Sequence, residues 1–175
     1  MALGVDYDRQ DCSLARALEL VGERWTMLIL RDAFFGVRRF SDFAAHLDIS
    51  RAVLAARLSA LVEAGLLSRA SDGGHPWYDL TDEALELWPA LYALAQWGER
   101  TSTRDAPRRL FDHAGCGGAL ERSGRCSSCG ATPPPEELVT RPGPGADPTL
   151  RDDPVSVALR RPHRLLEPLL TKQLR

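Results

Sequence analysis

The chain has 175 residues, of which 44% are hydrophobic, and its formal net charge is −2. This length and composition suit one globular core with a small appendage, and the weakly acidic balance excludes bulk charge as a sign of nucleic-acid binding. No apolar run reaches the roughly 20 residues of a membrane span, and the first residues show neither a basic start nor an apolar signal core. We therefore expect a cytoplasmic protein with no membrane partner.

The first predicted elements lie between residues 13 and 35. Apolar residues recur there at helical spacing and are interrupted near Gly22, so we expect one or two packed helices. A single cysteine, Cys12, immediately precedes them.

Residues 40–81 predict two helices around a tight corner, followed by a hairpin. That order is typical of a winged helix-turn-helix. Ser41 and Ser50 are suited to cap the two helices. We expect the second helix to enter a groove of double-stranded DNA. The residues on or near its exposed face are Ser50, Arg51, Ala52 and Arg57.

After Gly65 the pattern changes to two short β-prone runs on either side of Asp72-Gly73-Gly74. We interpret this hairpin as the wing, with Arg69 and His75 flanking its turn as candidate DNA contacts. Thr81 then predicts the cap of a long helix over residues 83–102.

The charge distribution weighs on DNA binding in two ways. Residues 1–100 contain ten arginines and fifteen acidic residues, which opposes it. Phosphates are felt over about one Debye length, roughly 8–10 Å, so local placement counts for more than the sum. The arginines in or beside the predicted motif are Arg38, Arg39, Arg51, Arg57 and Arg69. Two alternatives stay open: Arg57 could pair with a carboxylate inside the fold, and Ser50 is a helix cap before it is a phosphate contact.

The outer helices carry more apolar residues than one small domain can cover, which favours a two-fold homodimer. These residues are Leu14, Leu18, Leu87, Leu91 and Leu94. In such a dimer, two reading helices roughly 34 Å apart would match a near-palindromic operator.

From Thr103 onward the composition shifts to Arg, Gly, Pro and Cys. We predict a DNA-binding and dimerisation domain over residues 1–103, a zinc-ribbon-like module over 104–140, and a Pro/Gly linker with a short helical tail over 141–175. The fold class is therefore mainly α with a small β-hairpin wing (α+β), extended by a small Cys/His-rich segment.

The module contains one H-x2-C and one C-x2-C knuckle. Their residues are His113, Cys116, Cys126 and Cys129. Two pairs of such ligands suit tetrahedral Zn²⁺ in a closed, structural site, and metal binding would supply folding free energy that so few apolar residues cannot. The alternative is a Cys126–Cys129 disulfide or free thiols, which a reducing cytoplasm disfavours.

Several motifs together resemble the HxlR-type winged-helix regulators, which are MarR-like in fold. They are Cys12, G-x-x-W-T-x-x-I-L at 22–30, G-x-x-R-F-S at 36–41, I-S-x-x-V-L-x-x-R-L at 49–58, E-A-G-L at 63–66 and Y-x-L-T at 78–81. The resemblance covers residues 12–98 and implies a homodimeric bacterial regulator of transcription that binds promoter DNA. Members usually carry Pro and then Lys where this chain has Arg51 and Ala52, so a familiar contact is lost or moved to Arg51.

The resemblance also opens an alternative function, a ligand- or redox-responsive switch. Some members use the cysteine at the position of Cys12 as a sensor, although a lone thiol is more often inert. Aromatic residues could line a pocket for a small-molecule effector at the dimer interface, or could simply form core: Trp25, Phe34, Phe35, Phe40, Trp88, Tyr92 and Trp97. We do not expect an enzyme, because no HExxH, nucleophile elbow or phosphate loop is present.

Overall fold

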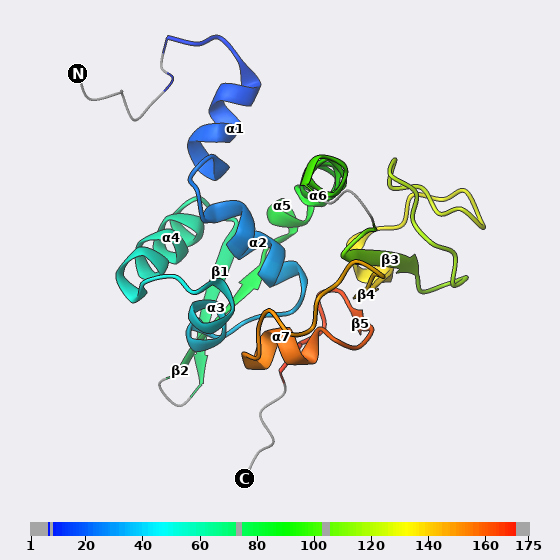
Figure 1. The fold of residues 1–175 in the computed structure, drawn as a ribbon. Coiled ribbons are helices and arrows are strands. Elements are labelled where there is room, and N and C mark those ends of the chain that lie inside the picture. Colours follow the sequence, from blue (N-terminus) through cyan, green and yellow to red (C-terminus); the bar gives the residue numbers. More distant parts are fainter. Residues whose placement is uncertain (1–6, 8, 73–74, 103–105, 171–175) are drawn as a thin grey trace.

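The computed structural model describes residue 7 and residues 9–72, 75–102 and 106–170. Helices α1 to α6 and a two-stranded hairpin come first along the chain, and a three-stranded sheet with helix α7 lies beside them (Figure 1). The protein is mainly helical with small antiparallel sheets, as predicted. None of its described helices is long and apolar enough to cross a membrane.

The first two helices have different surroundings. α1 (Ser13–Val21) projects from the body of the molecule, and Ala15 is its one buried residue (Figure 1). α2 (Thr26–Phe34) lies in the core, and most of its residues are buried. The break predicted near Gly22 is confirmed, because this residue ends α1 and donates its backbone N–H to the carbonyl oxygen of Leu18 at 2.7 Å.

The predicted helix-turn-helix is formed by α3 (Phe40–Leu47) and α4 (Arg51–Glu63). Asp48 turns the corner between them in the left-handed conformation, with a φ of 52°. Four apolar side chains fasten this pair of helices to the core: Phe43, Leu54, Leu58 and Leu61. Their burial fixes which side of α4 faces outward.

The two predicted caps of these helices have different outcomes. The hydroxyl of Ser50 accepts the backbone N–H of Val53 at 3.3 Å, which confirms Ser50 as the cap of α4. The prediction for Ser41 is wrong, because α3 begins one residue earlier, at Phe40, and Arg39 occupies the capping position without a side-chain bond.

The wing is the antiparallel hairpin of β1 (Leu67–Asp72) and β2 (His75–Leu80). Leu67 pairs with Leu80 at the end that joins the body of the domain. The turn residues 73–74 lie outside the described residues. The two strands are longer than the β-prone runs predicted them to be.

The hydroxyl of Thr81 caps α5 (Asp82–Leu85), which is followed by α6 (Trp88–Ser102). The prediction of one helix over residues 83–102 is therefore wrong. Pro89 explains the break, since proline has no backbone N–H to donate to the preceding turn and is tolerated only in the first turn of a helix.

The C-terminal extension is built on a sheet with the order β3-β4-β5. β3 (Arg109–His113) and β5 (His163–Arg164) both pair antiparallel with β4 (Leu138–Pro142). A single 3-10 turn, η1 (Pro135–Glu137), precedes β4, and α7 (Pro154–Ala158) lies between β4 and β5 in the chain. The segment predicted to be a linker with a helical tail thus holds a helix and a strand.

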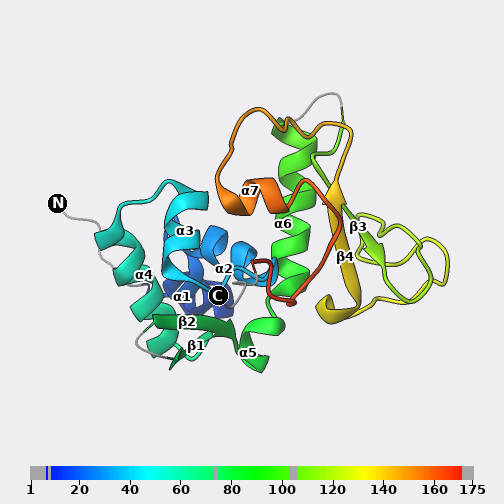
Figure 2. The same cartoon turned by 90° about the horizontal axis from the view of Figure 1, so that it is seen from below.

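One hydrophobic core joins the helix-turn-helix domain to the extension. The extension contributes Phe111, Leu138, Val155, Leu159 and Leu165 to the same cluster that contains Phe34, Trp88 and Tyr92. In Figure 2, α7 lies between α3 and α6. The division into three domains stays a prediction, but the parts that the structure describes pack together.

Backbone hydrogen bonds also tie the extension to the end of α2. Leu166 donates to the carbonyl oxygen of Phe34 at 2.9 Å, and Leu169 donates to that of Gly36 at 3.0 Å. Gly36 has a φ of 82°, and a Cβ there would collide with the carbonyl group of Glu167. Only glycine therefore allows the chain to approach this closely.

Candidate nucleic-acid interface and metal centre

The exposed side of α4 begins at its first turn. Ser50, Arg51 and Ala52 are all exposed there. Leu54 and Leu58 on the opposite side have no exposed surface, so the helix cannot rotate without uncovering them. This arrangement presents the N-terminal end of α4 to a neighbouring molecule, as a reading helix requires.

The two arginines of α4 have different partners. The guanidinium of Arg51 lies 5.0 Å from the ring centroid of Phe40, and no carboxylate among the described residues pairs with it. Nη1 of Arg57 lies 3.5 Å from Oε2 of Glu23. Arg57 therefore has a carboxylate partner within the chain, which is one of the alternatives that the sequence left open.

Arg38 and Arg39 also have partners within the chain. Nε of Arg38 lies 2.8 Å from Oδ1 of Asp79, and its Nη2 donates to the carbonyl oxygen of Leu166 at 3.2 Å. The guanidinium of Arg39 stacks over Trp77, 5.3 Å from the ring centroid. Arg38 therefore braces β2 against the extension, whereas Arg39 lies where α3 begins beside the wing.

Two wing residues and one cysteine complete the predicted set. Arg69 is exposed on β1, opposite Tyr78. His75 is the first residue of β2, and its side chain lies outside what the structure describes. Cys12 is an exposed free thiol directly before α1.

The structure brings together the four predicted metal ligands. They are His113, Cys116, Cys126 and Cys129, and their ligand atoms all lie within 4.8 Å of one another. Nδ1 of His113 is 3.3 Å from Sγ of both Cys116 and Cys129, and Sγ of Cys116 is 3.4 Å from Sγ of Cys126. Three sulfurs and one imidazole nitrogen at these separations could hold a metal ion between them.

The two knuckles have the same backbone geometry. Gly117 donates to the carbonyl oxygen of His113 at 2.8 Å, and Gly130 donates to that of Cys126 at 2.9 Å. Both glycines have a φ of 72°. Hydrogen bonds from the backbone N–H groups of Cys129 and Ser128, together with Cys116 and His113, lower the pKa of Cys126 to about 6 although burial raises it, so this thiol favours the thiolate that a metal binds.

A fifth residue, Glu137, supports the cluster from outside. Its Oε2 lies 3.2 Å from Nε2 of His113, on the side of the ring away from the cysteines. A carboxylate in this position accepts a hydrogen bond from Nε2–H and leaves Nδ1 free to bind a metal. Sequence reasoning missed Glu137, because no spacing rule links it to either knuckle.

The aromatic residues fall into two groups. Phe34, Trp88 and Tyr92 are buried and join Phe111 of β3, with the rings of Trp88 and Phe111 5.4 Å apart. Trp97 is 57% exposed on α6. Most of these aromatic residues therefore belong to the core, which was one of the two alternatives predicted for them.

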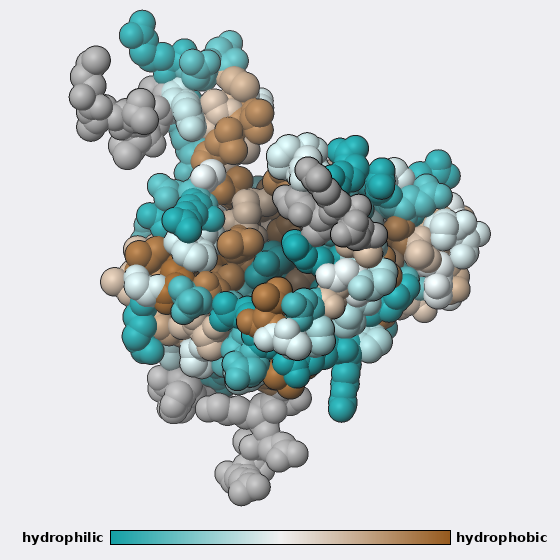
Figure 3. Space-filling view, in the orientation of Figure 1, coloured by the Kyte–Doolittle hydropathy of each residue, from teal (hydrophilic) through white to brown (hydrophobic). Residues whose placement is uncertain are grey.

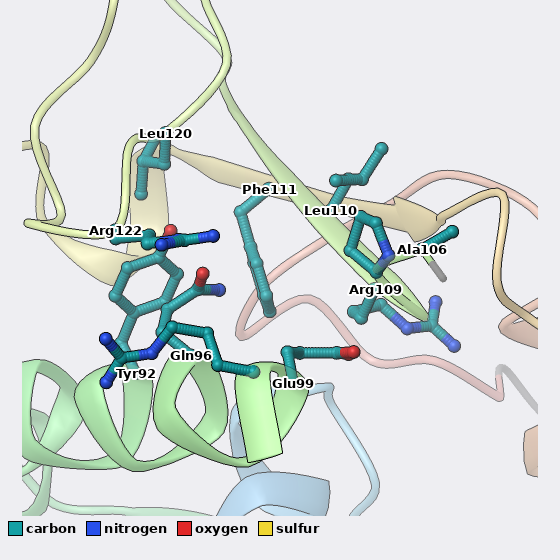
Figure 4. Close-up of a pocket in the computed structure, with 11 residues that line it drawn as sticks. Tyr92, Gln96, Glu99, Ala106, Arg109, Leu110, Phe111, Leu120 and Arg122 are labelled. Carbon is teal, nitrogen blue, oxygen red and sulfur yellow. The ribbon is translucent and has the colours of Figure 1, made fainter. Parts of the chain in front are cut away.

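Two hollows border the aromatic cluster between α6 and β3. One has a volume of about 430 Å³, and Figure 4 shows Tyr92, Gln96 and Glu99 of α6 facing Phe111 of β3 across it. The other, about 600 Å³, opens toward α2 and includes Leu28 and Leu94 in its walls. Both hollows lie within one chain, so the effector cavity predicted at a dimer interface stays a prediction.

Comparisons with known proteins identify the family. The model of the HxlR-like helix-turn-helix matches residues 20–106. The uncharacterized HTH-type transcriptional regulator Rv3095 of Mycobacterium tuberculosis (strain H37Rv) is 44% identical over 137 residues, which are 76% of this chain and 87% of that protein. The chain belongs to the HxlR-like helix-turn-helix family. The relatives that it matches are named as HTH-type transcriptional regulators, and this chain is a regulator of the same kind.

Other relatives agree with this assignment. The uncharacterized HTH-type transcriptional regulator YdeP of Bacillus subtilis (strain 168) is 28% identical over 121 residues, 63% of this chain and 94% of that protein. The crystal structure of PA1607, described as a candidate transcription factor, has a TM-score of 0.53 and 42% identity over 57% of this chain and 71% of its own.

The similarity to Rv3095 reaches beyond the HxlR-like domain. A match over 76% of the chain is longer than the part up to residue 106, where the family model ends, so it includes part of the extension. At least part of the extension is therefore similar between this chain and that relative. The contacts that join it to the HxlR-like domain, such as that of Leu166 with Arg38, gave no signal in the sequence.

Proposed function

We propose that this regulator binds promoter DNA sequence-specifically as a homodimer, with the first turn of α4 in the major groove and the wing alongside. The observation that carries the proposal is the exposure of Ser50, Arg51 and Ala52 on a helix whose opposite side is fixed in the core. Arginine is the side chain best suited to bidentate contact with guanine, so Arg51 is the residue we assign to base recognition.

The other predicted contacts would act on the DNA backbone. Ser50, Arg39 and Arg69 lie around α4 and the wing, where side chains of this kind bind phosphates and fix orientation. We place His75 with them. Arg38 and Arg57 have carboxylate partners in the chain and would have to exchange them for phosphates, so we expect them to contribute less.

An exposed apolar surface supports the dimer. Its members on α1, α2 and α6 are Leu14, Leu18, Leu20, Leu28, Leu94 and Trp97, each at least 37% exposed. Figure 3 shows apolar side chains on α1 and on the face beneath it. Because α1 buries so little in its own chain, a second copy is the occupant we propose for this surface.

Light scattering after size-exclusion chromatography tests the dimer. The native chain is compared with the variant Leu18→Glu. We expect a dimer for the native chain and a monomer for the variant, because a charge at a buried contact is costly. The control is Leu150→Glu, since Leu150 is 74% exposed in the extension. A native monomer, or a variant dimer as tight as the native one, contradicts the proposal.

We further propose that the knuckles bind Zn²⁺ in a structural site. Three thiolates and one imidazole form a common tetrahedral zinc set, and the donors here leave no open position for a substrate. On this proposal the protein acts by binding DNA and not by catalysis, and it works in the cytoplasm.

The alternative function is a switch that responds to a ligand. The larger hollow favours it, because about 600 Å³ is enough to hold a small molecule. Cys12 is exposed, which a redox input would need, but its role as a sensor stays a prediction. Selection of bound fragments from the host genome, with and without metabolite extract, tests both functions: recovery of the same upstream regions supports DNA recognition, and a change with extract supports the switch.

A further inference from the structure

The larger hollow is a cleft between the HxlR-like domain and the extension. α2 and α6 provide two walls, and β3 with the end of α7 provides the third. Its volume of about 600 Å³ lies within the range typical of small-molecule sites, roughly 300–1,000 Å³. The domain and the extension are both needed to form it.

Most of the lining is apolar and aromatic. The aliphatic members are Met27, Leu28, Leu91, Leu94 and Leu159, and the aromatic ones are Phe35, Trp88, Tyr92 and Phe111. Several of these rings already contact one another in tilted or edge-to-face pairs. A flat aromatic molecule could extend this stacking.

Three arginines, Arg31, Arg108 and Arg109, line the cleft, and only the guanidinium of Arg31 has a carboxylate partner among the described residues. Arg31 donates through Nε and Nη2 to Oδ1 of Asp32, at 2.9 and 2.6 Å. Asp32 is fully buried and also bonds His46, whose Nδ1 lies 2.8 Å from its Oδ2. One carboxylate thus serves a guanidinium and an imidazole.

Arg109 is the second arginine and has no acidic partner among the described residues. It donates through Nη1 to the carbonyl oxygen of Leu159 at 3.0 Å and lies 5.7 Å from the ring centroid of Phe35. Burial and the nearby charge of Arg31 lower the pKa of Arg109. A partly buried cation beside a like charge is costly unless an anion accompanies it.

The remaining charges do not neutralise this pair. Arg108 and Glu99 also line the cleft, and Oε1 of Glu99 accepts the backbone N–H of Arg108 at 3.0 Å. With Asp32 and Glu99 against the three arginines, the cleft keeps a net positive charge.

We propose that this cleft binds a small aromatic carboxylate, with its ring among the aromatic walls and its carboxylate on Arg109. Charge and shape complementarity both favour such a molecule. Arg109 lies beyond residue 106, where the family match ends, so the site depends on the extension. That occupancy alters DNA binding rests on the proposed function; the binding itself does not.

Calorimetry on the purified full chain tests the site with 1-naphthoate and with its neutral counterpart, 1-naphthamide. The two probes have the same ring and differ in charge. We expect the carboxylate to bind roughly tenfold more tightly or better, because a charge-assisted contact to arginine is lost with the amide. Equal affinities, or no binding of either probe, overturn the proposal.

Three variants locate the carboxylate. Arg109→Gln should weaken naphthoate roughly tenfold and leave naphthamide unchanged, and Arg109→Lys should keep part of the preference. Arg122→Gln is the matched control, because Arg122 lines only the other hollow, where Figure 4 shows it beside Tyr92. Full naphthoate affinity in folded Arg109→Gln, or loss in Arg122→Gln alone, assigns the binding elsewhere and overturns the proposal. If Arg109→Gln fails to fold, Arg109→Lys and the pair of probes still decide.

Gel shifts with and without 1-naphthoate separate this inference from the proposed function. Calorimetric binding without any DNA complex means that the cleft is a ligand site and the DNA proposal fails. A DNA complex with no calorimetric binding means the reverse.

Discussion

The backbone N–H of Leu166 donates a hydrogen bond of 2.9 Å to the carbonyl oxygen of Phe34, the last residue of α2. Carbonyl groups at the end of a helix have no partner within the helix, and buried ones need another donor. The extension supplies that donor. It therefore completes a core helix of the HxlR-like domain and is more than an appendage to it.

Shortening a buried side chain of the extension should destabilise the whole protein. Leu165 is 1% exposed and belongs to the shared core, so Leu165→Ala should lower the free energy of unfolding by about 2–5 kcal/mol. Urea unfolding followed by circular dichroism measures this. Leu150→Ala is the control and should change stability by no more than about 0.5 kcal/mol, because Leu150 is 74% exposed. Equal effects of the two variants would mean that the extension folds separately.

The local parts of the fold could be predicted from the sequence. The apolar spacing of α4 and the cap at Ser50 are patterns within one or two turns, and both knuckles are patterns of four residues. Pro89, by contrast, lies in the first turn of α6 and interrupts a predicted helix that apolar spacing alone would make continuous.

The remaining features depend on residues far apart in the chain. The bond between Leu166 and Phe34, the carboxylate of Glu137 beside His113, and the position of Arg109 in a cleft arise only from packing. No period or spacing rule encodes such contacts, so the sequence predicted helix α4 and the four Cys and His residues of the knuckles but not the residues that support them.

Two arginines should affect DNA binding in different ways. Arg51→Ala should relax sequence preference, since a bidentate contact to guanine is worth about 1–3 kcal/mol. Arg39→Ala should weaken binding to all sequences and flatten the salt dependence by about one unit, because a phosphate contact carries no sequence information. Gel-shift titrations at several salt concentrations measure both.

The matched control for this pair is Arg161→Ala, because Arg161 is exposed in the extension. It should leave both affinity and preference unchanged. Equal losses on every sequence from Arg51→Ala would refute the assignment of this residue to base recognition.

The metal proposal predicts that one cysteine matters and another does not. Protein purified without added metal should contain about one equivalent of zinc, and Cys129→Ser should lose it and melt at a lower temperature. Cys12→Ser should keep both the zinc and the melting temperature, because Cys12 lies directly before α1 and is not part of the Cys and His cluster. Elemental analysis and thermal denaturation give the answer. Full zinc content in Cys129→Ser would contradict the proposed set of zinc ligands.

Acid should weaken the N-cap of α7, which is the side chain of Asp153. Burial alone would raise the pKa of Asp153, but hydrogen bonds from the hydroxyl and backbone of Ser156, with Arg151 nearby, hold that pKa below its usual value of 3.8. The ionised carboxylate therefore stabilises the fold above about pH 4, and this contribution is lost as the pH falls through the lowered pKa.

The variant Asp153→Asn keeps a capping side chain but removes the charge. It should be less stable than the native chain at pH 7, and the difference should shrink below about pH 4. Urea unfolding across this pH range measures it, with the exposed Asp152→Asn as control. A difference that stays constant with pH would show that the charge of Asp153 does not contribute.

The most direct measurement is a competition gel shift of the full chain on an upstream region recovered from its host genome. The account predicts that this region outcompetes random oligonucleotides of equal length by roughly a thousandfold or more, within the range usual for specific binding, and that Arg51→Ala removes most of that advantage. If random oligonucleotides compete equally well against every native upstream region, the chain does not recognise a DNA sequence and the account is contradicted.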